Sequence, residues 1–464
     1  MLRTLVQKEI LGHVLSLRFA VAFVLTVVLV GLSFHLTTSE YRTGREERGD
    51  RVARYSAELD WALTRWPKSE MWWEVPSHAF KLDGKFQAVQ DPPLSAMVRG
   101  LTPAYPAGLR VTRDGWTNIE RDAWWNPLLG LYQPPDFAYV VGVVMSLLAM
   151  LLVFDAVCGE KEAGTLRLML ASGAARHTVL LSKWSGASIV SMLPFLVVTL
   201  AGVGYMWAIG VLDLTGAQSL RVGVLILVSL FYIGVFISFG LLVSAAVHRR
   251  VTALFIALFV WVVWVLVLPN LTPTVAKLIA PAPSVRKITA EKQAVDREVD
   301  LLWRRLSLIS AGEQFNQQEQ RLEQERGSRK ANWDRFLEQS LDTQNRWTEG
   351  LARISPFGSW IYAATDVTET GSRDYQRFED ARRRTIAAMG DAEDAYWKQR
   401  DQVYADGVGQ MPILRDQTLP TMNITRPDVA QSLDTAMQDI LILAIWSAVC
   451  FMGAFLLFVR YDVR

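Results

Sequence analysis

The sequence predicts an all-α polytopic membrane protein with six transmembrane helices and two extracytoplasmic insertions. Its 464 residues are 51% hydrophobic, and the mean hydropathy of +0.18 is high for a soluble protein. Apolar runs close to or longer than the roughly 18 residues that a membrane span needs recur along the chain. Two stretches of ordinary soluble composition interrupt these runs, so the chain is expected to cross the membrane repeatedly and also to fold outside it.

Six apolar segments are predicted to be the spans. They cover residues 17–36, 137–157, 184–211, 222–247, 251–269 and 437–459. The first segment ends in Phe34-His35-Leu36-Thr37, without the small-residue cleavage pattern of a secretory signal, so we expect it to be retained as a span.

Basic residues in the short loops predict the orientation of the spans, because Lys and Arg are poorly translocated. Four short segments carry them: Arg3, Lys8 and Arg18; Lys161, Arg167, Arg176 and Lys183; Arg249 and Arg250; Arg460 and Arg464. The loop at 212–221 carries fewer. The four basic segments, and with them both termini and the tail at 460–464, are predicted to be cytoplasmic.

The first insertion, 38–136, is predicted to be mixed or irregular. It opens with a charged helical stretch from Glu40 to Leu63 that continues span one, and it then becomes rich in Trp, Pro and Gly. The aromatic residues admit two interpretations, a small core with an interfacial belt or a ligand-stacking cleft. We favour the first.

The second insertion, 270–436, is predicted to be mainly helical. Its polar run from Ser284 to Ile354 is expected to form one helix and Ser372 to Tyr404 another, packed as an antiparallel pair or small bundle. Between them, the segments 356–358 and 366–371 supply turn residues. The cluster Arg382-Arg383-Arg384 is interpreted as a solvated helix face in preference to an anion site.

Two cytoplasmic segments are predicted to contain short helices. Residues 1–16 place their apolar side chains broadly on one helical face, which predicts an amphipathic helix in the membrane interface and an elbow near Leu17. Residues 158–183 are too short for a domain and predict a charged turn followed by a short amphipathic helix at about 165–171. Such a helix is marginal alone in water, so we expect it to lie against a partner or the membrane.

Composition and motifs exclude several functions. The net charge of +2 is too balanced for a nucleic-acid footprint. Cys158 and Cys450 fall in or beside apolar runs, so neither insertion can hold an internal disulfide. The five histidines lack metal-ligand spacing, and no G-x-S-x-G or H-E-x-x-H motif occurs, which argues against a catalytic or metal site. Without a G-x-x-x-x-G-K-[ST] phosphate loop, the chain is not expected to hydrolyse ATP alone.

The predicted spans hold no ionisable residue near their middles. His35 and Asp439 fall at outer ends, and Arg18 and Asp155 near inner ends, where the interface is accessible. This favours a path of apolar, small and aromatic residues for a lipophilic or amphiphilic substrate. Candidate pathway-lining residues are Tyr139, Met145, Trp261 and Trp264. The small residues of span four are better explained by close helix packing: Gly234, Ser238, Gly240 and Ser244.

Several segments together resemble the type-2 ATP-binding-cassette (ABC) permease family. The run 147–156, followed by Gly159-Glu160-Lys161-Glu162 and 164–168, is similar to the end of a span and the coupling helix of that family. Residues 183–186 resemble the start of the next span. The segment 92–100 is similar to one in the subgroup with an enlarged first outside loop, whereas 270–436 has little counterpart in shorter relatives.

The resemblance implies a permease dimer in a bacterial inner membrane, formed with an identical or homologous second subunit. Each coupling helix would dock into a separate cytoplasmic ATPase dimer, which binds ATP and Mg. The coupling residues that it implies are Glu160, Lys161, Glu162, Gly164, Thr165, Leu166 and Arg167. The expected function is the non-catalytic permease subunit of an exporter. The alternative is an ATPase-driven mechanotransmitter that moves its outside domains to act on a periplasmic or envelope partner.

Overall fold

Within the described part of the chain, six helical segments are long and apolar enough to cross a membrane, which confirms the predicted polytopic architecture. The segments are Leu17–Arg54, Phe137–Glu162, Arg176–Ala208, Gly216–Ala246, Arg250–Ile279 and Val429–Arg460. Each overlaps one predicted span. Most begin or end outside the predicted bounds, because polar residues continue the helix past the apolar run.

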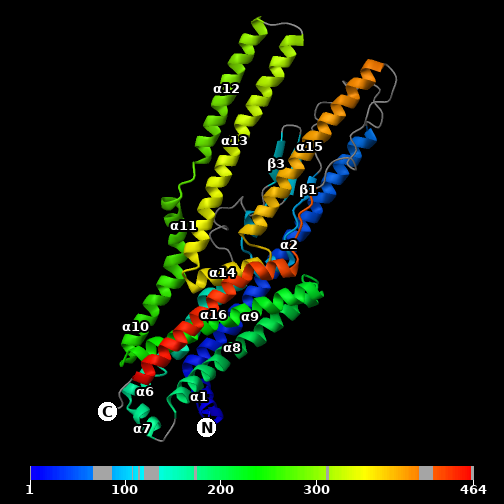
Figure 1. Cartoon of the computed structure of the whole chain (residues 1–464). Helices are drawn as coiled ribbons and strands as arrows, with labels where there is room; N and C mark the ends of the chain where they lie inside the picture. The colour runs from blue at the N-terminus through cyan, green and yellow to red at the C-terminus, as the bar shows by residue number, and fades with distance from the viewer. Residues whose placement is uncertain are drawn as a thin grey trace. The chain divides into compact units, whose positions relative to one another are not determined.

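The structure is a computed structural model that describes residues 2–65, 86–106, 108–112, 115–119, 135–171, 175–309, 313–406 and 422–460. The chain folds as two units. One consists of Met1–Ala257 with Trp360–Arg464, and the other of Leu258–Ser359. Figure 1 shows the helices and strands of both.

Helix α9 (Gly216–Ala246) is the central helix of the first unit, since 72% of its apolar window is buried. Helices α5 (Ser146–Val153), α8 (Arg176–Ala208) and α16 (Val429–Arg460) pack against it. Asp439 of α16 is fully buried. The expectation that this carboxyl lies at an accessible interface is therefore wrong, because neighbouring helices cover it.

The chain starts with α1 (Leu2–Val14), and the long helix α2 (Leu17–Arg65) begins after a break at the place of the predicted elbow. Both helices pack against α8. Gly186 of α8 permits the close approach of α1, because a Cβ at this position would lie 2.8 Å from the Cβ of Glu9. Helix α2 continues span one through the charged stretch that follows it.

Among the described membrane segments, the second and the fifth contain a π-helical stretch. In the second, α4 (Phe137–Tyr139) and η5 (Val140–Met145) lead into α5. The fifth is one continuous run of α10 (Arg250–Trp261), η6 (Val262–Val267) and α11 (Leu268–Ile279). A π-helical turn changes which side chains share a face and is frequent at functional sites.

The first insertion contains a small antiparallel sheet, in keeping with its mixed composition. Strands β1 (Phe86–Ala88), β2 (Gly108–Thr112) and β3 (Gly115–Ile119) pair in chain order. Two short 3-10 helices, η2 (Pro93–Ala96) and η3 (Thr102–Ala104), lie between the first two strands.

Helix α15 (Ser372–Asp406) contributes to the same apolar core as the first insertion. Val89 and Tyr105 of that insertion pack with Phe378 and Ala381 of α15. The Tyr105 and Phe378 rings meet edge to face with centroids 4.9 Å apart. The predicted second helix therefore packs against the first insertion.

The polar run at 284–354 forms two helices, where the sequence predicted one. Helices α12 (Val285–Ile309) and α13 (Glu313–Ala352) pack together as a hairpin, and α11 packs on α13. Ion pairs join the two arms of the hairpin: Arg326 with Asp300 at 2.6 Å, Arg329 with Glu298 at 2.8 Å and Lys330 with Asp296 at 2.5 Å. The antiparallel pair in this unit therefore consists of α12 and α13, which both come from the run at 284–354.

Helix α14 (Pro356–Val367) starts where the sequence predicted a turn at 356–358. The hydroxyl of Ser355 accepts hydrogen bonds from the N–H groups of Phe357 at 3.0 Å and Gly358 at 3.3 Å. A serine N-cap followed by proline at the first helical position is a strong start signal. The prediction of a turn at 356–358 was wrong, because Pro356 and Gly358 were taken as turn residues although they lie in the first turn of α14.

Candidate functional site

The segment between the second and third membrane helices folds as two short helices. They are α6 (Cys158–Glu162) and α7 (Thr165–Ala171). Helix α7 covers the same residues as the predicted amphipathic helix, whereas the predicted charged turn is helical. Gly164 joins the two with a φ of +73°, in the left-handed region that glycine adopts at little cost.

The start of α6 is fixed to the end of α9. The hydroxyl of Ser244 accepts hydrogen bonds from the N–H groups of Val157 at 2.9 Å and Cys158 at 3.0 Å. The first N–H groups of a helix have no partner inside it, so Ser244 acts as a cap supplied by another helix. The Lys161 ammonium donates to the carbonyl of Ala245 at 2.5 Å, near the end of α9.

Arg250, at the start of α10, holds α6 from another direction. Its backbone N–H donates to the Glu162 carboxylate at 3.0 Å, and its guanidinium donates to the carbonyl of Gly159 at 3.3 Å. A Cβ on Gly159 would lie 2.8 Å from the Arg250 guanidinium. Any side chain at position 159 would therefore displace this contact.

Lys183 of α8 is buried between two carboxylates, with 2% of its side chain exposed. Its Nζ lies 2.7 Å from Oε1 of Glu160 in α6 and 3.1 Å from Oε1 of Glu9 in α1. Removing an ammonium from water costs several kcal/mol, about as much as well-placed partners return. The Glu9–Lys183–Glu160 network thus joins α1, α6 and α8.

Arg18, at the start of α2, contacts the turn before α6. Its guanidinium pairs with Asp155 at 2.8 Å and lies over the Phe154 ring, 5.2 Å from the centroid. Polar contacts therefore connect the turn and α6 to helices α1, α2, α8, α9 and α10.

Helix α7 has one buried and one exposed side. Leu166 is 1% exposed, whereas Leu168 is 74% exposed. Thr165 and Arg167 are also exposed. Helix α7 therefore offers an apolar and basic surface next to a helix that the rest of the unit holds in place.

Of the seven predicted coupling residues, Gly164 joins the two helices and Leu166 is buried, and the other five fall into two groups. Glu160, Lys161 and Glu162 make contacts within this chain. Thr165 and Arg167 lie on the exposed side of α7. The contacts of Glu160, Lys161 and Glu162 attach α6 to other helices of the same chain. Their part in coupling to an ATPase stays a prediction.

The four candidate pathway residues lie at the two π-helical stretches. Tyr139 directly precedes η5 and Met145 ends it, whereas Trp261 directly precedes η6 and Trp264 lies inside it. Tyr139 is 52% exposed, and Met145 is buried, with its sulfur 3.4 Å from the Thr26 hydroxyl of α2. The placement of these residues on a pathway stays a prediction.

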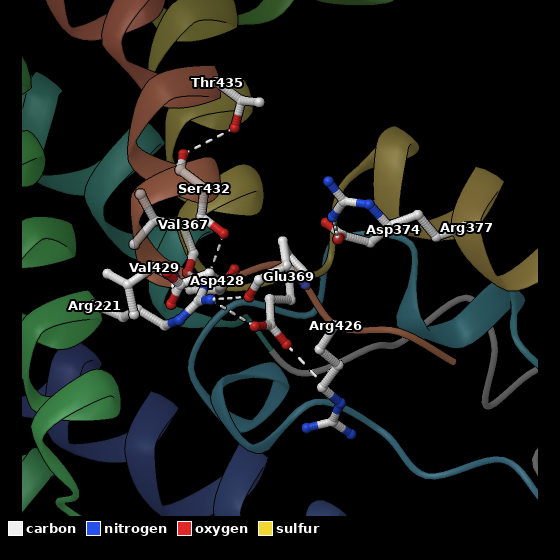
Figure 2. A network of polar contacts seen from close by, with 12 residues as sticks. Arg221, Val367, Glu369, Asp374, Arg377, Arg426, Asp428, Val429, Ser432 and Thr435 are labelled. Atoms are coloured by element: carbon white, nitrogen blue, oxygen red, sulfur yellow. Dashed lines mark hydrogen bonds and ion pairs between the residues drawn. The ribbon is translucent and has the colours of Figure 1, made fainter. Parts of the chain in front are cut away.

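A second polar network surrounds Arg221, the buried guanidinium near the start of α9 (Figure 2). It donates to the carbonyls of Val367 at 3.0 Å and Pro427 at 2.8 Å. It also donates to the Ser432 hydroxyl at 2.9 Å and pairs with Glu369 at 2.8 Å. Arg221 thus ties α9 to the end of α14, to the segment before α16 and to α16 itself.

Two carboxylates of this region have raised pKa values. Burial raises the pKa of Glu369 above its usual range, and this effect outweighs the opposite effects of Arg221 and Arg426. Burial likewise raises the pKa of Asp374, although Arg377 contacts it at 2.7 Å. Both groups bind a proton more readily here than in water.

Sequence reasoning missed the partners of these networks. Lys183 was interpreted as the start of a span. Arg221 was considered only as one of the basic residues of the short loops that predict the orientation of the spans. An ionisable residue just inside an apolar helix is expensive unless it is paired. Glu9 in the apolar elbow and Lys183 in an apolar run could therefore have been recognised as residues that need a charged partner. The sequence does not show that they pair with each other.

The six spans, the elbow helix and the α6–α7 segment define a multi-pass membrane protein with the arrangement expected of an ABC transporter membrane subunit. The family of ABC-2 family transporter proteins matches residues 3–463, and the chain belongs to this family. The resemblance seen in the sequence is thus confirmed.

A similar protein is the probable ABC transporter permease protein NosY of Stutzerimonas stutzeri. It is 32% identical over 139 residues, which cover 28% of this chain and 48% of the relative. The chain therefore spans about half the length of this relative.

Proposed function

We propose that the chain is the permease subunit of a bacterial ABC exporter that moves a lipophilic or amphiphilic substrate across the inner membrane. A separate cytoplasmic ATPase dimer, which binds ATP and Mg, drives the movement. Membership of the ABC-2 family and the similarity to a probable ABC permease support the class. The direction of transport rests on the resemblance to the type-2 ABC permease family, and the substrate class rests on the apolar character of the predicted spans.

The observation that carries the proposal is the contrast between α6 and α7. Helix α7 exposes Leu168 and Arg167, so it has a surface for a partner. Helix α6 is bonded to Ser244, Lys183 and Arg250, which belong to three different membrane helices. A displacement of α7 by a bound ATPase would therefore reach several spans at once, through charge-assisted hydrogen bonds.

The test is co-purification of the chain with its cognate ABC ATPase. Leu168→Glu should reduce the amount of bound ATPase at least about tenfold, because an apolar contact is replaced by a charge that must be desolvated. Leu308→Glu is the matched control, since Leu308 is an 86% exposed leucine of α12. Equal ATPase binding by wild type and Leu168→Glu would overturn the coupling assignment.

We further propose that two permease subunits assemble with the path between them, lined in part by the second and fifth spans. Helix α10 supports this arrangement. Val251, Phe255 and Phe259 recur every four residues along one stripe of α10 and are 65%, 68% and 69% exposed. Cysteines at 255 and 259 should cross-link between copies in an ATP-dependent manner. A cysteine at the similarly exposed Leu193 of α8 is the control, and a native mass with one permease per assembly would exclude the arrangement.

A mechanotransmitter is the second candidate function, and the Arg221 network favours it. Four contacts tie α9 to chain segments at the ends of α14 and α16, so movement of α9 would move those segments too. Stimulation of the assembled ATPase by a small amphiphile supports export. Stimulation only by a periplasmic protein supports mechanotransmission.

A further inference from the structure

A cavity of about 320 Å³ lies in the first unit, beside the Arg221 network. Its lining comes from three parts of the chain: residues 89–92 with Tyr105, the region of Glu369, Asp374 and Arg377, and the segment 422–427. The volume is within the range of small-molecule sites, roughly 300 to 1,000 Å³. None of the function argued above uses this cavity.

One side of the cavity is apolar. Val89, Tyr105 and Met422 line it and also belong to the buried cluster with Phe378. Ile424 packs against that cluster as well. The apolar side is therefore a fixed surface of the core, able to receive the hydrocarbon part of a ligand.

The carboxylates of the cavity are already neutralised by partners. Asp91 pairs with Arg48 at 2.8 Å, Glu369 with Arg221 at 2.8 Å and Asp374 with Arg377 at 2.7 Å. The side chains of Asp91, Glu369 and Asp374 are 6%, 12% and 10% exposed. A cationic ligand would therefore find its counter-charges occupied.

Arg426 is different, because its side chain is 41% exposed and makes long polar contacts. Among the described residues, its contacts are the carbonyl of Asp91 at 3.5 Å and the carboxylate of Glu369 at 4.0 Å. Both distances exceed that of a strong charge-assisted hydrogen bond. Figure 2 shows the Arg426 side chain directed away from Arg221, with Glu369 between them. A guanidinium has five donors in a planar fork, so Arg426 keeps donors for an anion.

We propose that this cavity binds an anionic amphiphile, with a phosphate or carboxylate group on Arg426 and the apolar part against Tyr105 and Met422. The planar fork of Arg426 matches such a group in a bidentate manner. The anion would replace the long contact of Arg426 with Glu369, and the other oxygen of Glu369 stays on Arg221. Occupancy of the cavity is thereby connected to α9.

The phosphate chemistry could be supplied by a lipid head group or by free phosphate. The experiment uses the full chain in phosphatidylcholine nanodiscs and calorimetric titration with three probes. They are dihexanoyl phosphatidic acid, dihexanoyl phosphatidylcholine and inorganic phosphate. Phosphatidic acid should bind with at least about tenfold higher affinity than phosphatidylcholine. Its phosphomonoester carries more negative charge than the phosphodiester of phosphatidylcholine and has no choline cation beside it, so it pairs more strongly with a guanidinium.

Arg426→Gln should weaken phosphatidic acid binding at least about tenfold, and Arg426→Lys should weaken it less. Arg384→Gln is the control, since Arg384 is an exposed arginine of α15 that does not line the cavity. Met422→Ser should weaken binding of phosphatidic acid and leave that of inorganic phosphate unchanged. Unfolding temperatures equal to that of wild type show that the variants are folded.

Two results support the site and identify its ligand. Arg426-dependent binding of phosphatidic acid without binding of inorganic phosphate indicates a lipid head group, and comparable Arg426-dependent binding of both indicates free phosphate. Equal binding of the two lipids, unchanged binding by Arg426→Gln, or no binding of either phosphate probe would overturn the proposal. Since no ATPase takes part, the outcome is independent of the proposed coupling.

Discussion

The Nζ of Lys183 lies 2.7 Å from Glu160 and 3.1 Å from Glu9. One ammonium therefore links the elbow helix α1, the third span and α6. The Glu160 side chain is 23% exposed and that of Glu9 is 15% exposed, whereas that of Lys183 is 2% exposed. Lys183 is consequently the member whose loss leaves the largest uncompensated charge.

Lys183→Met should lower the free energy of unfolding by about 3 to 5 kcal/mol, as expected for one partner removed from a buried ion pair. The measurement is the unfolding temperature of the purified chain in detergent. The double variant Lys183→Met with Glu160→Gln should recover part of the loss, because it replaces the Glu160 carboxylate, which has lost its ion-pair partner, with a neutral amide. A double variant less stable than the single one would show that repulsion between carboxylates is not the cause.

Gly164→Pro should uncouple ATP hydrolysis from transport, because proline cannot adopt the φ of +73° found between α6 and α7. Gly164→Asn is the matched variant, since asparagine tolerates the left-handed region better than other side chains. We expect it to retain most activity. Transport by reconstituted vesicles and ATPase binding are measured together, and full activity of the proline variant would contradict this role of Gly164.

Glu369 should make stability fall as the pH rises. Its pKa is raised above the ordinary 4.5, so the folded state binds this proton more tightly than the unfolded state. That contribution is complete below pH 4.5 and is lost as the pH rises through the folded-state pKa. The unfolding temperature of wild type relative to Glu369→Gln should therefore decrease from about pH 4.5 to pH 7.

Glu298→Gln is the control for this pH dependence. A hydrogen bond from Arg329 lowers the pKa of Glu298, so its contribution has the opposite sign and is lost as the pH falls. The same slope in both comparisons would show that the pH effect does not come from Glu369.

Labelling of single cysteines in intact cells should place Ser340 of α13 outside and Arg167 of α7 inside. The basic short loops predict this orientation. A membrane-impermeant thiol reagent should modify position 340 and leave position 167 unmodified until the cells are opened. Modification of position 340 only after opening would reverse the predicted topology.

The α12–α13 hairpin should become more sensitive to protease as salt increases. Its arms are joined by exposed ion pairs such as Arg329 with Glu298, and the attraction within such pairs is screened by salt. Limited proteolysis within 285–352 should be several times faster at 1 M than at 0.1 M NaCl. Equal rates would mean that apolar contacts alone hold the arms together.

The sequence was sufficient for the spans and for α7, because both depend on local pattern. A run of apolar residues must cross the bilayer as a helix, and the apolar residues of 165–171, next to the charges of 160–162, predicted a short amphipathic element. The helix start at Pro356 was also local, since Ser355 before Pro356 matches a cap followed by the first helical position. It could have been predicted.

Other features depend on contacts between distant parts of the chain. Ser244 looked like a small residue for helix packing, and its role as the cap of α6 follows only from the approach of Cys158. The hairpin at α12 and α13 was missed for a different reason. The run contains Gly312, Gly327 and Gly350, and two of these lie inside α13. A single glycine therefore gives little local signal for the end of a helix in this run.

Helix α2 is unbroken from Leu17 to Arg65. At about 1.5 Å per residue, it is a rod of about 70 Å, of which only about 30 Å is needed to cross a bilayer. A rod pivoting by about 10° at one end displaces its other end by about 12 Å, on the order of a helix diameter. Small rotations among the membrane helices would thus become large excursions at the distal end of α2, by leverage alone and without any change in its internal hydrogen bonds.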